Sequence, residues 1–122
     1  MTDWFPDSPI YLQVRERLAD MLLDSPLHDG DPLPSVRTIA SDYRLNPLTV
    51  LRAFQMLEDE GVIEKKRGIG MFVRQGGRER LLALEREVFR TRHWPKILRT
   101  ISRLGLDPTT LLNSPPNEDK TP

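Results

Sequence analysis

Apolar residues recur at helical spacing in three stretches of the first half of the chain, and polar turns separate these stretches. The spacing predicts helices over about residues 9–23, 35–43 and 47–60. Ser35 and Asn46 each stand at the start of a stretch, and both have side chains that cap helix N-termini. The turn between the second and third helices is short, which is typical of a helix-turn-helix unit.

After residue 61 the pattern changes from helical periodicity to alternation. Two short alternating segments, 62–65 and 71–74, flank a loop that contains Gly68 and Gly70. Such a pair of segments predicts a β-hairpin. A hairpin that follows a helix-turn-helix unit forms a wing, so residues 1–75 are predicted to be a winged helix-turn-helix domain.

The rest of the chain is predicted to be a short helical extension, 76–113, that begins at a glycine hinge, 76–77. Pro95 is expected to interrupt its long helix, and Asp107 to cap a short last turn. The tail, 114–122, has three prolines and no large apolar residue, so we expect it to be disordered. The predicted fold class is therefore mainly α with one small β-hairpin.

The composition limits the classes of function. The chain has 122 residues, a formal net charge of zero and no cysteine. One domain of ordinary size fits this length, whereas a barrel enzyme or a two-domain dinucleotide enzyme does not. Without cysteine there is no disulfide or thiolate zinc site. The N-terminus does not resemble a signal peptide, and no apolar run would span a membrane, so we expect a cytoplasmic protein without a membrane partner.

Catalytic and metal-binding motifs are not evident in the sequence. The two histidines, His28 and His93, do not stand in metal-ligand spacing with other candidate ligands. The glycine pair of the hairpin loop joins two strands and is too short for a phosphate-binding loop. We therefore expect no enzyme activity, no metal and no cofactor.

Basic residues are concentrated locally although the net charge is zero. Residues 34–53 contain three arginines and one aspartate, and residues 62–74 contain four basic residues and one glutamate. Phosphate contact is local and electrostatic, so such segments within acidic surroundings favour a DNA-binding face.

Four short motifs occur in order along the first domain. They read LPSVRTIA (33–40), LNPLTVLRAF (45–54), LEDEGVI (57–63) and GIGMFV (68–73). In these motifs the chain resembles the GntR family of bacterial transcription regulators, and the resemblance covers residues 9–73. The resemblance implies a winged helix-turn-helix domain that binds DNA.

The sequence departs from the family pattern at the start of the third helix. Pro47 and Leu51 stand where many members have arginine, and Leu48 stands where a polar residue is common. Base contacts made by those arginines cannot be transferred to this chain. The Asn-Pro form resembles the short-chain, YtrA-like branch of the family.

The third helix is the expected recognition helix, because its N-terminal turns face away from its apolar stripe. Asn46 has the chemistry to pair with adenine, and Arg52 suits guanine or phosphate. The alternatives are that Asn46 only caps the helix and that Arg52 is only a solvated surface charge. The predicted DNA-binding residues are Asn46, Leu48, Thr49, Arg52, Lys65, Lys66, Arg67, Gly68 and Gly70. The family resemblance adds Arg37, which without it would be interpreted as a surface arginine.

The extension has a large apolar face that so short a helical pair cannot bury alone. Either it packs back onto the winged domain or it forms a symmetric dimer, which the family resemblance favours. The predicted dimer-interface residues are Leu81, Leu84, Val88, Phe89, Trp94, Ile97, Leu98 and Ile101.

These features together predict a regulator that binds double-stranded DNA, acting as a homodimeric repressor on a palindromic operator. The alternative from another class is a winged-helix adaptor that binds proteins without sequence-specific DNA binding. A full effector-binding domain would not fit in the residues after position 75, so a small-molecule effector is not expected.

Overall fold

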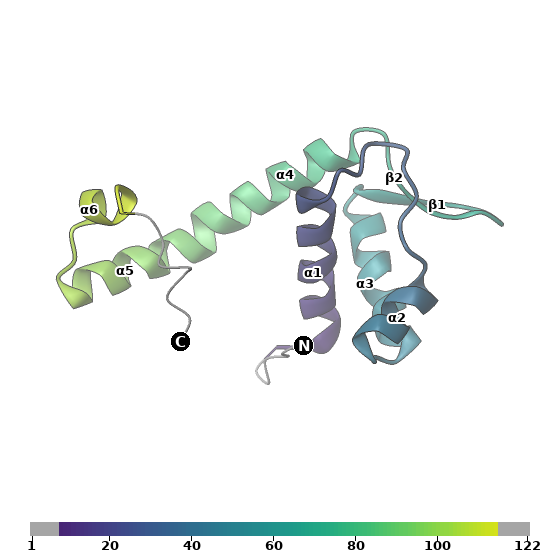
Figure 1. Cartoon of the computed structure of the whole chain (residues 1–122), viewed down its shortest axis with the longest axis horizontal. Helices are drawn as coiled ribbons and strands as arrows, with labels where there is room; N and C mark the ends of the chain where they lie inside the picture. Colours follow the sequence, from purple (N-terminus) through teal and green to yellow (C-terminus); the bar gives the residue numbers. More distant parts are fainter. Residues whose placement is uncertain (1–7, 115–122) are drawn as a thin grey trace. The chain divides into compact units, whose positions relative to one another are not determined.

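The computed structural model describes residues 8–114, and the winged domain occupies the first part of them (Figure 1). Helix α1 (Ile10–Asp24) is followed by α2 (Val36–Tyr43) and α3 (Pro47–Asp59). Strands β1 (Ile63–Lys66) and β2 (Gly70–Val73) then form an antiparallel hairpin. The predicted helix-turn-helix and wing are confirmed, with bounds that agree to within about two residues.

Local side-chain contacts account for the two helix starts of the helix-turn-helix unit. The Ser35 hydroxyl accepts a hydrogen bond from the Thr38 N–H, 3.0 Å away, at the start of α2. The Asn46 side-chain oxygen accepts one from the Leu48 N–H, 2.8 Å away, at the start of α3. Between the helices, Arg44 adopts a left-handed conformation with φ 57°, which ends α2 and turns the chain sharply into α3.

The core of the domain lies where α1 packs against α3 and the hairpin closes over their ends. Val14 and Leu18 of α1 and Phe54 and Leu57 of α3 are fully buried in this core. Side chains of this size each contribute about 1.5–3 kcal/mol when they leave water. This packing fixes the direction of α3 and leaves its opposite side exposed.

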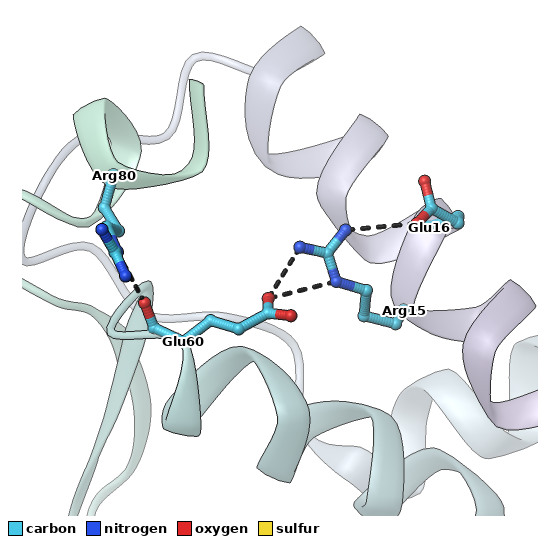
Figure 2. Close-up of polar contacts among 4 residues, drawn as sticks. All are labelled: Arg15, Glu16, Glu60 and Arg80. Atoms are coloured by element: carbon cyan, nitrogen blue, oxygen red, sulfur yellow. Dashed lines mark hydrogen bonds and ion pairs between the residues drawn. The ribbon is translucent and has the colours of Figure 1, made fainter. Parts of the chain in front are cut away.

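A polar cluster connects α1 to the residues just after α3 and to Arg80 (Figure 2). Buried Arg15 of α1 donates hydrogen bonds to the Glu60 carboxylate, at 3.1 and 2.6 Å, and pairs with Glu16 at 3.3 Å. The Glu60 backbone oxygen accepts a 3.0 Å hydrogen bond from Arg80. These contacts satisfy a buried guanidinium and hold the C-terminal end of α3 against α1.

Helix α4 (Gly77–Val88) begins inside the winged domain. Gly77 is buried, and a Cβ at this position would overlap the carbonyl group of Val62. Leu81, one turn later, is fully buried in the same core. Gly77 is thus a point of close packing rather than a hinge residue, and the compact unit ends at Leu84, later than the predicted boundary at residue 75.

The second compact unit begins at Glu85 and is helical in its described part. It contains a π-helical turn, η1 (Phe89–His93), followed by α5 (Trp94–Leu104) and α6 (Pro108–Leu112). The expected break at Pro95 is absent within these residues, since the helical backbone continues through it. The wider turn of η1 lies just before the proline, whose ring has no N–H to donate to a regular helical hydrogen bond.

Asp107 caps α6 as predicted. Its carboxylate accepts hydrogen bonds from the Thr110 hydroxyl at 2.8 Å and the Thr109 N–H at 3.3 Å. The Thr110 hydrogen bond, followed by the Thr109 one, lowers the pKa of Asp107 from its ordinary value. Most of the predicted disordered tail, 115–122, lies outside the described residues.

The part of the chain that the structure describes contains no helix that is both long and apolar enough to cross a membrane. Likewise, within residues 8–114 no group of three or more histidine or acidic side chains is arranged to hold a metal ion.

Candidate nucleic-acid interface

The first turns of α3 form an exposed surface of the winged domain. Val50 and Phe54 point into the core, whereas Leu48 is 71% exposed and Arg52 is also exposed. Thr49 lies between them and is half-buried. The start of the predicted recognition helix is therefore accessible, as insertion into the major groove requires.

Asn46 caps α3, which is one of the two roles that the sequence allowed for it, the other being contact with a base. Its side-chain oxygen accepts the hydrogen bond from the Leu48 N–H. Pairing with both edge groups of adenine uses the amide oxygen and the amide NH2 together. The cap already uses the amide oxygen. Contact between Asn46 and DNA stays a prediction, in which the side-chain NH2 group would be the donor.

Arg52 has a partner that the sequence did not reveal. Its guanidinium carbon lies 3.8 Å from the centre of the Tyr11 ring, which is close enough for a cation–π interaction. Tyr11 is in the first turn of α1, and a shallow hollow is lined by Ile10, Tyr11, Leu48, Thr49 and Arg52. No local pattern predicts this contact, because α1 and α3 meet only in the folded domain.

The α2 start and the wing border the same side of α3. A small apolar hollow is lined by Val36 of α2, Leu51 of α3, and Lys65 and Met71 of the wing, among others. Arg37 follows Val36 and is exposed. The start of α2 and the wing thus meet α3 along the side that carries Leu51, whereas Arg52 lies in the other hollow, with Tyr11.

The wing tip is a tight turn between the strands. Gly68 and Gly70 have φ of 77° and 136°, conformations that residues with a Cβ rarely adopt. Lys65, Lys66 and Arg67 precede the turn and are exposed. The Lys66 ammonium lies 4.6 Å from the centre of the Phe72 ring. The two glycines leave the backbone on either side of the exposed Ile69 free to approach a sugar-phosphate edge closely.

The predicted dimer residues fall into two groups. Leu81 is fully buried in its own domain and Leu84 packs against that core, so the expectation that Leu81 faces a partner is wrong. Leu81 lies on the apolar stripe because the first turns of α4 pack against the core of the winged domain. The remaining residues lie in the second unit, where they are half-buried or exposed: Val88, Phe89, Trp94, Ile97, Leu98 and Ile101.

Fold and surface together define a winged helix-turn-helix protein, a class in which the second helix of the unit serves DNA recognition. The family model for the GntR family of bacterial regulatory proteins matches residues 10–73, more than half of the chain. The chain belongs to this family, whose members are regulators of transcription rather than enzymes.

The chain is similar to the transcriptional repressor YtrA of Bacillus subtilis, with 37% identity over 62% of this chain and 58% of the relative. A GntR family regulator from Listeria monocytogenes has a similar structure, with TM-score 0.73, 26% identity, and coverage of 89% of this chain and 94% of that one. BusR of Streptococcus agalactiae, solved with its busA promoter DNA, shares the fold at TM-score 0.61, 19% identity, and coverage of 76% and 46%. This chain covers 58% of YtrA and 54% of YhcF of Bacillus subtilis, and only 30% of the longer repressor NagR of the same organism.

Proposed function

We propose that this protein is a homodimeric transcriptional repressor that binds a palindromic operator, with α3 in the major groove and the wing at the minor groove. The observation that supports this best is the accessible start of α3, where Leu48 and Arg52 are exposed, in a domain whose wing also carries exposed basic residues. The relative YtrA is named as a repressor, and BusR is seen with promoter DNA. Occupation of a promoter site by such a domain would block transcription.

The extension supplies the proposed dimer contact. None of the described residues of η1, α5 or α6 is buried, although Phe89, Ile97 and Leu98 are large and apolar. Apolar faces of this kind are covered in stable proteins, and a second copy presents an identical face. A dimer of this motif binds two half-sites about one helical turn apart, roughly 34 Å.

Selection of bound sequences from a random pool of duplexes would test the function directly. We expect a two-fold symmetric site, which is then used for anisotropy titrations with the full chain at several salt concentrations. Affinity should fall steeply with salt because phosphate contacts release counterions. A pool that shows no enrichment, or equal binding to a scrambled duplex, would contradict sequence-specific recognition and favour a protein-binding adaptor.

The variant Arg52→Ala tests the recognition helix. If Arg52 pairs with a base, operator affinity should fall by about 1–3 kcal/mol, with a smaller loss on scrambled DNA. A phosphate contact would instead weaken binding to both duplexes equally. Arg103→Ala removes the same charge from exposed α5 and is the matched control. Unchanged binding by Arg52→Ala would remove Arg52 from the site.

A further inference from the structure

Leu48 has an apolar side chain that the rest of the domain leaves exposed to solvent. It is 71% exposed at the second position of α3, although leucine is normally buried. The next exposed residue of the helix along this side is Leu51, which is 40% exposed. Neither residue belongs to the buried core of the domain, which takes Val50 and Phe54 from this part of α3.

The position of Leu48 is set firmly by the residues around it. Pro47 restricts the backbone at the first helical position, and the Asn46 cap holds the Leu48 N–H. The backbone donor is therefore already used, and the side chain is what Leu48 can offer to a ligand. Thr49 and Arg52 share a shallow hollow with it, so the leucine stands among groups that suit DNA.

The major groove offers few partners for such a side chain. The base edges there are hydrogen-bond donors and acceptors, apart from the C5 methyl group of thymine. A leucine laid over a donor or acceptor would remove it from water without replacing its hydrogen bond, which is unfavourable. Contact with a C5 methyl has no such cost and buries apolar surface on both sides.

We propose that Leu48 contacts the C5 methyl group of a thymine and so specifies a T·A pair beside the base or phosphate that Arg52 contacts. The proposal rests on the proposed function, because it requires α3 to lie in the major groove. The expected consequence is an operator in which thymine is preferred, by a few-fold in affinity, at one position of each half-site.

Removal of single methyl groups from the DNA tests this contact. In the selected operator each thymine is replaced in turn by deoxyuridine, which lacks only the C5 methyl, and the full chain is titrated. We expect one position per half-site at which affinity falls about fourfold, the factor that corresponds to one buried methyl group. The variant Leu48→Ala should bind the unmodified operator more weakly and lose its sensitivity to deoxyuridine at that position.

A second modification separates the methyl group from the identity of the base pair. The same position is changed to C·G, with and without a C5 methyl on the cytosine. Methylation should restore affinity by about the same factor in the wild type and not in Leu48→Ala. Leu112→Ala, which shortens an exposed leucine in α6, should behave as the wild type.

The results of these titrations distinguish failure of the Leu48 proposal from failure of the proposed function. If deoxyuridine has no effect at any position while Arg52→Ala still weakens operator binding, the Leu48 proposal is overturned and the proposed function stands. If Leu48→Ala keeps the full deoxyuridine effect, another residue contacts the methyl group and the proposal is again overturned. If no operator is enriched and Arg52→Ala changes nothing, the proposed function itself fails.

Discussion

Single residues decide how well the recognition surface is prepared for DNA, and the contact of Tyr11 with Arg52 is the clearest example. A guanidinium on a long side chain loses conformational freedom when it binds a base or a phosphate. The Tyr11 ring lies 3.8 Å from the Arg52 guanidinium and restrains it before DNA arrives. In the proposed complex Tyr11 is a positioning residue, because its effect on DNA binding would pass through Arg52.

The variant Tyr11→Leu should weaken operator binding by about two- to fivefold, which corresponds to the loss of an exposed cation–π interaction. Tyr11→Phe keeps the ring and is the matched control. Anisotropy titrations of the two variants measure the difference, and combination with Arg52→Ala shows whether the effect passes through Arg52. Equal losses in both variants would mean that the hydroxyl, and not the ring face, is responsible.

At the scale of elements, the join between the wing and α4 depends on the absence of one side chain. Gly77 lies so close to the Val62 carbonyl that a Cβ would overlap it. Gly77 also donates a 2.6 Å backbone hydrogen bond to Arg74. The first turn of α4 therefore packs directly on the start of the wing and brings Leu81 into the core.

Gly77→Ala should lower the free energy of unfolding by about 3 kcal/mol or more, because the overlapping group is backbone and cannot rotate away. Gly76→Ala is the comparison, since its position has open space but a left-handed φ of 79°. We expect a smaller loss there, about 1–2 kcal/mol, from backbone strain alone. Urea denaturation measures both, and an equal or larger loss in Gly76→Ala would show that Gly77 does not need the close approach.

Some features of these elements could be predicted from the sequence and others could not. The starts of α2, α3 and α6 were predictable because Ser35, Asn46 and Asp107 bind N–H groups within three residues of themselves. The packing of Gly77 and the partner of Arg52 were not, because both depend on segments far apart in the chain. Leu81 shows the same limit, since an apolar stripe indicates burial without indicating against what.

At the scale of the whole molecule, the proposed regulator needs two copies, and the apolar face of α5 is where we expect them to meet. Leu98→Asp places a charge on that face, so the dimer should dissociate and operator affinity should fall. Lys96→Asp changes the charge of the same helix on its polar side and is the matched control. Sedimentation velocity over a range of concentrations measures the oligomeric state.

If the wild type sediments as a monomer at all concentrations, or if Leu98→Asp stays a dimer, α5 is not the dimer contact. If Leu98→Asp is monomeric, its operator titrations separate the contribution of dimer formation from that of DNA recognition by one winged domain. A monomeric variant should still bind a single half-site, since its winged domain keeps its own core of α1, α3 and the hairpin.

Sequence alone determined the order of elements, the caps, the turn glycines of the wing and the family, because each depends on residues near one another in the chain. Tertiary structure decided which side of α3 is exposed, which ring supports Arg52, and that Leu81 belongs to the winged domain. Periodicity identifies a face that leaves water, but only packing in three dimensions selects the surface that covers it.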